Sequence, residues 1–211
     1  MKKDKYVIMT IGRTHSGKST FGEDIKKSLR GSVLIQTDNI AEFLVDHFPK
    51  KMYTGDESNG DFKKPALKLS IFNIIRNHAI SIGHKNVIFS NSNLYRDFRK
   101  ENIDFFKENG YKIIGVYLNF HGSFLKKRIR ESSRDNSKLK TNDFEKLVDL
   151  QRNIIDIPKE SEFHYFYEVK KEEDLEKIKK KILRKIKGDK KKKIEVQKKR
   201  QKKCFFLFKY I

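Results

Sequence analysis

The alternation of short apolar runs with longer amphipathic stretches constrains this chain's fold most strongly. The apolar runs are rich in Val, Ile, Tyr and Phe and are bounded by turn residues, which is typical of buried strands. The five predicted strands are Tyr6–Ile11, Ser32–Gln36, Asn86–Ser90, Tyr111–Asn119 and His164–Val169. Because strands that alternate with helices form a mostly parallel sheet with helices on both faces, the sequence predicts an α/β fold.

The amphipathic stretches between these runs predict seven helices. These are Gly17–Arg30, Asp38–His47, Pro65–Ile82, Leu94–Asn109, Gly122–Ser133, Asp143–Ile155 and Glu172–Lys187. Gly31 and Gly110 directly follow two of them, at the position where glycine commonly ends a helix. The apolar residues of the last helix recur on one face, so we expect that helix to cover the sheet. The polar segment Pro49–Pro65 predicts a loop.

Positive charge is abundant and is concentrated at the end of the chain. The 211 residues include 49 Lys and Arg against 28 Asp and Glu, a net charge of +21. Residues 188–211 hold ten Lys or Arg and two acidic residues, and they finish with the segment Cys204–Ile211, CFFLFKYI. We therefore expect a folded domain over residues 1–187 and a polybasic tail over residues 188–211. The tail fits nucleic acid or anionic lipid, or an extension without a dedicated ligand.

Cysteine content and hydropathy limit the setting in which the chain works. Cys204 is the single cysteine, so an internal disulfide framework and a multi-cysteine metal site are excluded. No stretch has the length of apolar sequence that a membrane-spanning helix or a signal peptide needs. We expect a cytoplasmic protein without a transmembrane segment.

A glycine-rich motif follows the first predicted strand and opens the first predicted helix. The residues Gly12-Arg-Thr-His-Ser-Gly-Lys-Ser19 match G-x-x-x-x-G-K-[S/T], the phosphate-binding P-loop or Walker A motif. Such a loop curls so that its backbone N–H groups, and the positive end of the following helix, face a phosphate. Lys18 is expected to reach the β- and γ-phosphates of ATP, and the Ser19 hydroxyl to bind Mg²⁺. The expected nucleotide-binding residues are Gly12, Arg13, Thr14, His15, Ser16, Gly17, Lys18, Ser19 and Thr20.

A carboxylate follows the second predicted strand. Asp38 lies at the carboxyl end of that strand, the same sheet edge at which the P-loop lies. It could accept the proton of an attacking hydroxyl and help to hold Mg²⁺, or it could only cap the helix that begins there.

Basic residues gather on the predicted helix Gly122–Ser133 and just beyond it. Arg130 and Arg134 lie on the side opposite the apolar residues of this helix, and Arg128 lies near the apolar side. A basic arc followed by a polar linker is typical of a lid that closes over a transferring phosphoryl group, and equally of a solvated helix face.

Together these segments resemble the P-loop kinase superfamily, and in particular the polynucleotide 5′-hydroxyl kinases and the zeta-toxin-like and seryl-tRNA kinases. The similar segments are Ile8–Thr20, Thr37-Asp38 and Val87–Leu94, and the resemblance extends over about Lys5–Ile186. It implies a five-stranded parallel sheet, ATP with Mg²⁺, and transfer of the γ-phosphate to a hydroxyl. It also implies that Asp38 is the general base and that Arg130 or Arg134 is the lid arginine.

Two positions depart from the polynucleotide kinase pattern. Asn91 stands where the S-D-T-N-L segment of those kinases has its acid, and Ala41 stands where an arginine follows the base. The acceptor is therefore left as a nucleic-acid 5′-hydroxyl, a nucleoside or another small polar molecule. Candidates for an acceptor groove are Tyr53, Tyr95, Arg96 and Arg99, which are alternatively surface and packing residues. The alternative function is an ATP-binding module that hydrolyses slowly and acts as a switch or as an RNA-binding protein.

Overall fold

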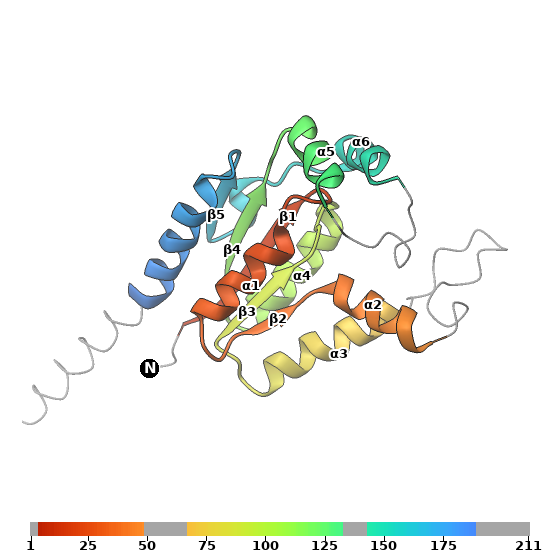
Figure 1. Ribbon diagram of the computed structural model, residues 1–211. Helices are drawn as coiled ribbons and strands as arrows, with labels where there is room; N and C mark the ends of the chain where they lie inside the picture. The colour runs from red at the N-terminus through yellow and green to blue at the C-terminus, as the bar shows by residue number, and fades with distance from the viewer. Residues whose placement is uncertain (1–3, 49–66, 133–142, 189–211) are drawn as a thin grey trace, which may run out of the picture.

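A five-stranded parallel sheet forms the centre of the computed structural model, which describes residues 4–48, 67–132 and 143–188 (Figure 1). The strands are β1 (Lys5–Gly12), β2 (Val33–Ile35), β3 (Asn86–Ser90), β4 (Tyr111–Leu118) and β5 (Tyr165–Val169). They lie in the order β2-β3-β1-β4-β5, and every neighbouring pair is parallel. The predicted α/β fold with five parallel strands is confirmed.

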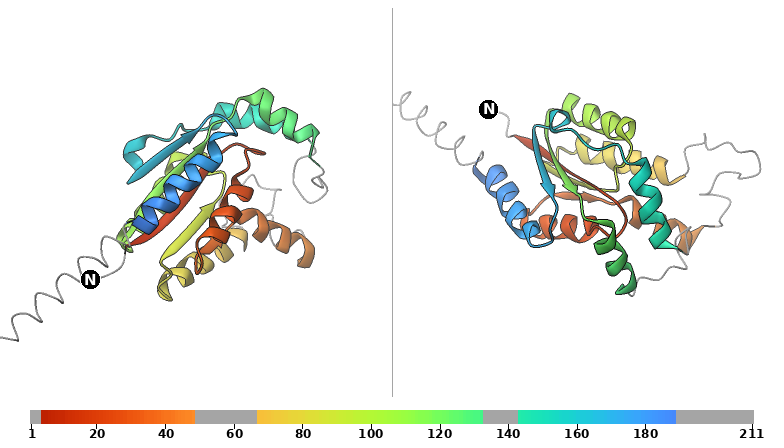
Figure 2. Two further views of the ribbon diagram at one scale, coloured as in Figure 1. Left: turned by 60° about the vertical axis from the view of Figure 1, so that its left-hand side comes forward. Right: turned by 90° about the horizontal axis from the view of Figure 1, so that it is seen from above.

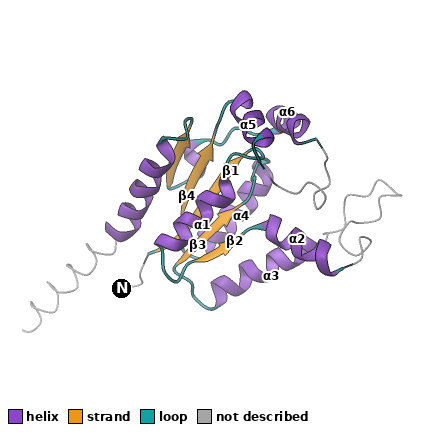
Figure 3. Ribbon diagram, viewed as in Figure 1, coloured by secondary structure: helices purple, strands orange, loops and turns teal. Residues whose placement is uncertain are grey.

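Helices fill the intervals between the strands, in the predicted order (Figure 3). They are α1 (Lys18–Ser28), α2 (Thr37–His47), α3 (Leu67–Ser81), α4 (Arg96–Glu108), α5 (Gly122–Arg130), α6 (Phe144–Ile154), the short 3-10 helix η4 (Glu160–Glu162) and a last helix over residues 174–188. No helix in the described ranges is long and apolar enough to cross a membrane. The predicted loop Pro49–Pro65, Arg134, and all but the first residue of the predicted tail lie outside the described residues.

Apolar side chains cover both faces of the sheet, as expected of strands buried on both sides. On one face, Phe21 and Ile25 of α1 and Ile178, Ile182 and Ile186 of the last helix share a core with alternate residues of β1, β3 and β4. On the other face, α2, α3 and α4 pack against the remaining strand residues. Figure 2 shows α1 and the last helix on the same side of the sheet. The molecule is thus a three-layer sandwich of helices, sheet and helices.

The topology places the end of β1 between the ends of two other strands. β3 pairs with β1 as far as Thr10↔Ser90, and β4 pairs with it as far as Gly12↔Leu118. In open α/β sheets, ligands bind outside the carboxyl ends of the strands, near the point where the strand order reverses. The segment that follows β1 therefore occupies the position in this fold where a ligand is expected.

A buried cation braces the loop that follows β3. The side chain of Arg99 is fully buried and forms an ion pair with Glu162 of η4 at 3.1 Å. Its guanidinium also donates to the carbonyl oxygens of Asn93 and Leu94 at 3.1 and 2.9 Å. Arg99 is therefore a packing residue, whereas Tyr95 and Arg96 are exposed and Tyr53 lies outside the described residues.

We expect Arg99→Met to lower the free energy of unfolding by about 3 kcal/mol, because the substitution leaves the Glu162 carboxylate largely buried without its partner. Denaturant unfolding followed by circular dichroism measures this loss. Arg96→Met, on the exposed side of the same helix, is the control and should change stability by less than about 0.5 kcal/mol. Equal losses in the two variants would contradict the bracing role of Arg99.

Candidate active site

The P-loop forms a tight turn in which two glycines are required. A Cβ on Gly12 would lie 2.8 Å from Ser16 Oγ and 2.9 Å from the carbonyl oxygen of Leu118, which is closer than side chains can approach. Gly17 has a φ of 83° and His15 a φ of 56°, both in the left-handed region. Gly17 adopts this backbone conformation at little energetic cost because it has no Cβ. The loop is curled between the end of β1 and the first turn of α1, as the motif predicts.

Lys18 spans this loop. Its ammonium group donates to the carbonyl oxygen of Arg13 at 2.6 Å and to Ser16 Oγ at 3.3 Å. The positive charge is thereby held against the loop at the N-terminal end of α1, where the helix dipole also favours an anion. Ser19 and Thr20 lie in the first turn of the same helix.

Arg13 and His15 contact protein on the sides of the loop. Nη2 of Arg13 donates to the carbonyl oxygen of Phe120 at 2.5 Å, and burial lowers the pKa of this guanidinium. The ring of His15 meets the ring of Phe144 of α6 edge-on, with 4.9 Å between centroids. These two side chains fix the shape of the loop from the β4 side and from α6.

Residues at the end of β3 attach the P-loop to the start of α2. Ser90 Oγ donates to the carbonyl oxygen of Lys18 at 2.9 Å. Asn91 Oδ1 accepts from the backbone N–H and the hydroxyl of Thr37 at 2.8 and 2.9 Å. Asp38 is the next residue, exposed in the first turn of α2. The end of β3 therefore holds both the first turn of α1, through Ser90, and the residue before Asp38, through Asn91.

Arg128 of α5 lies directly beside the P-loop. Its Nη1 donates to the carbonyl oxygen of His15 at 3.4 Å, and a Cβ on Gly17 would lie 3.1 Å from the same nitrogen. The guanidinium lies over the ring of Phe124, with 4.8 Å to the centroid, and pairs with Glu172. Sequence spacing predicts that this arginine lies near the apolar side of its helix. In the structure its guanidinium stacks on Phe124 and contacts the loop.

A cavity of about 230 Å³ opens between Arg128 and α1. Its walls come from the start of α1, from α5 and from the segment after β5, as far as the first turns of the last helix. They are formed by Gly17, Thr20, Phe21, Asp24, Arg128, Glu172, Leu175, Glu176 and Lys179. The cavity is therefore continuous with the P-loop at Gly17 and Thr20, and it has both apolar and charged walls.

Helix α6 also contacts the P-loop. Gln151 Oε1 accepts from the backbone N–H of Thr14 at 2.6 Å, so one loop N–H is held by this helix. Two ion pairs join α6 to α5, Lys126 with Asp149 at 2.7 Å and Arg130 with Glu145 at 2.7 Å. The Arg130 pair is exposed and lowers the pKa of Glu145 through its hydrogen bond. Arg130 thus links two helices, and its expected role as a lid arginine stays a prediction, as does that of Arg134.

Comparisons with known proteins agree on the fold. No family model matches this sequence, and no curated protein matches it. Among solved structures, a protein from Chloroflexus aurantiacus J-10-fl has a TM-score of 0.63 at 17% identity, covering 90% of this chain and 100% of that chain. Shikimate kinase from Bacteroides thetaiotaomicron has a TM-score of 0.53 at 15% identity, covering 86% and 98%. A gluconokinase from Sinorhizobium meliloti 1021 has a TM-score of 0.51 at 20% identity, covering 88% and 93%.

These similarities show that the chain has the fold of the P-loop kinases. The fold that the resemblance to those kinases implies is therefore confirmed. The finer resemblance to polynucleotide 5′-hydroxyl kinases stays a prediction, because sequence identities this low indicate a shared fold but not a shared substrate.

We expect Asn91→Ala to loosen the start of α2, because both hydrogen bonds that Oδ1 accepts from Thr37 are lost. The free energy of unfolding should fall by about 1–2 kcal/mol, and hydrogen exchange at the Thr37 amide should become faster. Asn109→Ala, which removes an exposed hydrogen bond to Phe105, is the matched control. Unchanged exchange at Thr37 in the Asn91 variant would show that this asparagine does not hold α2.

Proposed function

We propose that this chain is an ATP-dependent kinase that transfers the γ-phosphate of ATP to a hydroxyl group. The observation that carries the proposal is the joint placement of Lys18 across the P-loop and of Asp38 on the hydrogen-bonded unit beside it. A cation that binds the phosphates and a carboxylate near the same sheet edge are the two groups that phosphoryl transfer to a hydroxyl requires. The likeness of the fold to shikimate kinase and gluconokinase supports the same class of reaction.

The P-loop fits a triphosphate on its own geometry. A side chain at Gly12 would collide with Ser16 and Leu118, and a side chain at Gly17 would meet the Arg128 guanidinium. In this proposal the loop N–H groups and the Lys18 ammonium hold the β- and γ-phosphates, and the Ser19 hydroxyl and Asp38 hold Mg²⁺. When bound, the ion neutralises charge that develops on the phosphate oxygens. Asp38 orients the acceptor hydroxyl and takes its proton.

The cavity beside Arg128 fits the remainder of the nucleotide. It meets the P-loop at Gly17 and Thr20, so a nucleoside whose phosphates lie in the loop would extend into it. Arg128 provides a planar cation at the entrance, held in place by Phe124 and Glu172. We therefore assign Arg128 to nucleotide binding. The acceptor is proposed to be a nucleic-acid 5′-hydroxyl or a small nucleoside or sugar.

Phosphate transfer tests the proposal directly. The protein is incubated with γ-labelled ATP, Mg²⁺ and separate pools of 5′-hydroxyl RNA and DNA, nucleosides, sugars and tRNA. Label should appear in one pool, and Lys18→Ala should abolish the transfer because the γ-phosphate charge is uncompensated. Asp38→Asn should keep nucleotide affinity within about twofold while turnover falls at least about a hundredfold. Label released only as inorganic phosphate would favour the slowly hydrolysing switch, and normal turnover in Asp38→Asn would refute the base.

Two arginines of α5 provide a matched pair of variants. Arg128→Ala should weaken binding of a non-hydrolysable ATP analogue about tenfold, which corresponds to about 1.4 kcal/mol, because the cation at the cavity entrance is lost. Arg130→Ala should leave this affinity unchanged, because its guanidinium pairs with Glu145 away from the cavity. Isothermal titration calorimetry measures both. The reverse ranking of the two affinities would contradict the assignment of Arg128. A fall in the turnover of Arg130→Ala alone would support a role for Arg130 over the transferring phosphate.

A further inference from the structure

Six exposed cations lie on the outer side of the helical layer formed by α1 and the last helix. We call this surface the basic face, and it consists of Lys26, Arg30, Lys177, Lys181, Arg184 and Lys187. The four cations of the last helix recur at intervals of three or four residues, so they form one stripe along the helix. From Lys177 to Lys187 this stripe is about 15 Å long at 1.5 Å per residue.

The basic face differs from the other basic surfaces of this lysine-rich chain. On α4 and on the α5–α6 pair, Lys100, Lys126 and Arg130 each form an ion pair with a neighbouring carboxylate. In the described ranges, none of the six cations of the basic face has a carboxylate within ion-pair distance. Residues 177–188 contain seven Lys or Arg and no acidic residue. No neighbouring carboxylate therefore neutralises the six cations of this face within the described residues.

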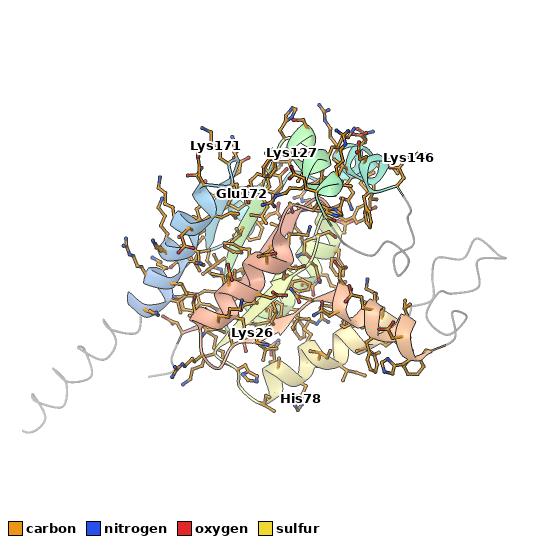
Figure 4. The ribbon with its side chains drawn as sticks, in the orientation of Figure 1. Lys26, His78, Lys127, Lys146, Lys171 and Glu172 are labelled. Atoms are coloured by element: carbon orange, nitrogen blue, oxygen red, sulfur yellow. The ribbon has the colours of Figure 1, made fainter. Side chains whose placement is uncertain are left out.

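The two helices present these cations side by side. Lys179 of the last helix lies 3.9 Å from Asp24 of α1, and apolar residues of both helices share one core. Both helices begin near the P-loop edge of the sheet and run away from it, so the stripe points away from the proposed active site (Figure 2). Lys26 lies at the end of α1 remote from the P-loop (Figure 4). The face is thus about two helices wide and distinct from the place where phosphate transfer is proposed.

The sequence that continues from the last helix indicates the partner. Residues 189–203 contain nine Lys or Arg against two acidic residues. The aromatic residues all come after these cations, and three of the four lie in the uncharged block Phe205-Phe-Leu-Phe208. Tyr210 follows Lys209, and the aliphatic residues Ile194 and Val196 lie among the cations. Single-stranded nucleic acid is bound by aromatic residues interleaved with cations, whose rings stack on successive bases. Cations segregated from a compact apolar block suit a bilayer surface, where charges meet lipid headgroups and apolar side chains enter below them.

We propose that the basic face binds an anionic lipid bilayer. The kinase domain would then lie on the membrane through α1 and the last helix, with the P-loop edge free of it. Each cation near an anionic bilayer strengthens binding about fivefold. This proposal does not depend on phosphate transfer, because the six cations are separate from the P-loop, Asp38 and Arg128.

Co-sedimentation of the full chain with vesicles tests the proposal. Vesicles of phosphatidylcholine with phosphatidylserine should bind the protein, and vesicles of phosphatidylcholine alone should not. The variant K181Q/R184Q/K187Q should bind the anionic vesicles at least about tenfold more weakly, since three charges are removed from the stripe. Raising the salt concentration should weaken the wild type more than the variant.

A matched variant distinguishes an effect of the basic face from an effect of net charge alone. K100Q/K107Q/K146Q removes the same charge from exposed positions of α4 and α6, and it should keep vesicle affinity within about twofold. Equal losses in the two triple variants, or no loss in either, would overturn the proposal. Stronger binding to RNA or duplex DNA than to anionic vesicles, with loss of the nucleic-acid binding in K181Q/R184Q/K187Q, would overturn it in favour of a nucleic-acid surface.

Two further measurements show whether a loss of vesicle binding comes from the basic face or from misfolding of the domain. Affinity for a non-hydrolysable ATP analogue should be the same in wild type and both triple variants, which shows that the domain is folded whether or not transfer is detected. Should K181Q/R184Q/K187Q fail this test, K26Q/R30Q on α1 replaces it and should weaken vesicle binding at least about fivefold. Unaltered vesicle binding in K26Q/R30Q would then exclude the basic face.

Discussion

The hydrogen bonds between the ends of β1 and β3 are the constraint on which the site depends. Asn93 Nδ2 donates to the carbonyl oxygen of Thr10 at 2.7 Å, and the backbone N–H of Gly12 donates to the carbonyl oxygen of Ser92 at 3.0 Å. Ser90 holds the first turn of α1 from the same strand end. Because parallel strands deliver their carboxyl ends to one edge, a few polar side chains after β3 can position two helices at once.

Two helices contact the P-loop. Arg128 contacts it from α5 and Gln151 contacts it from α6, and these helices are joined to each other by ion pairs. A change in how α5 and α6 pack would therefore alter both of these contacts with the loop.

The fold of this chain does not identify an acceptor. Shikimate kinase and gluconokinase share this architecture with the chain at identities of 15% and 20%, and their names already differ in the molecule they phosphorylate. The framework that holds the phosphates is built from strand ends and helix starts, whereas acceptor pockets come from variable loops. In this chain, Asn91 uses its Oδ1 to hold Thr37, so a neutral amide does there what a carboxylate oxygen could also do.

Local signals in the sequence were sufficient for the elements and for the P-loop. Apolar periodicity located all five strands, since burial on both faces demands continuous apolar runs. The glycine spacing located the loop, since only residues without a Cβ fit its curl. The position of Asp38 followed from a strand end, although its catalytic role is still a prediction.

Only the tertiary structure decided which distant side chains meet at the site. Gln151 and Thr14 are 137 positions apart in the chain, and Arg128 and His15 are 113 positions apart. Arg99 became a buried brace because Glu162, 63 positions away, neutralises it. Such contacts depend on how the helices pack on the sheet, and this packing is determined by the whole core. A local sequence pattern therefore cannot predict them. The sequence by itself thus determined the sheet and the phosphate loop, and the packing of α5, α6 and η4 decided what surrounds them.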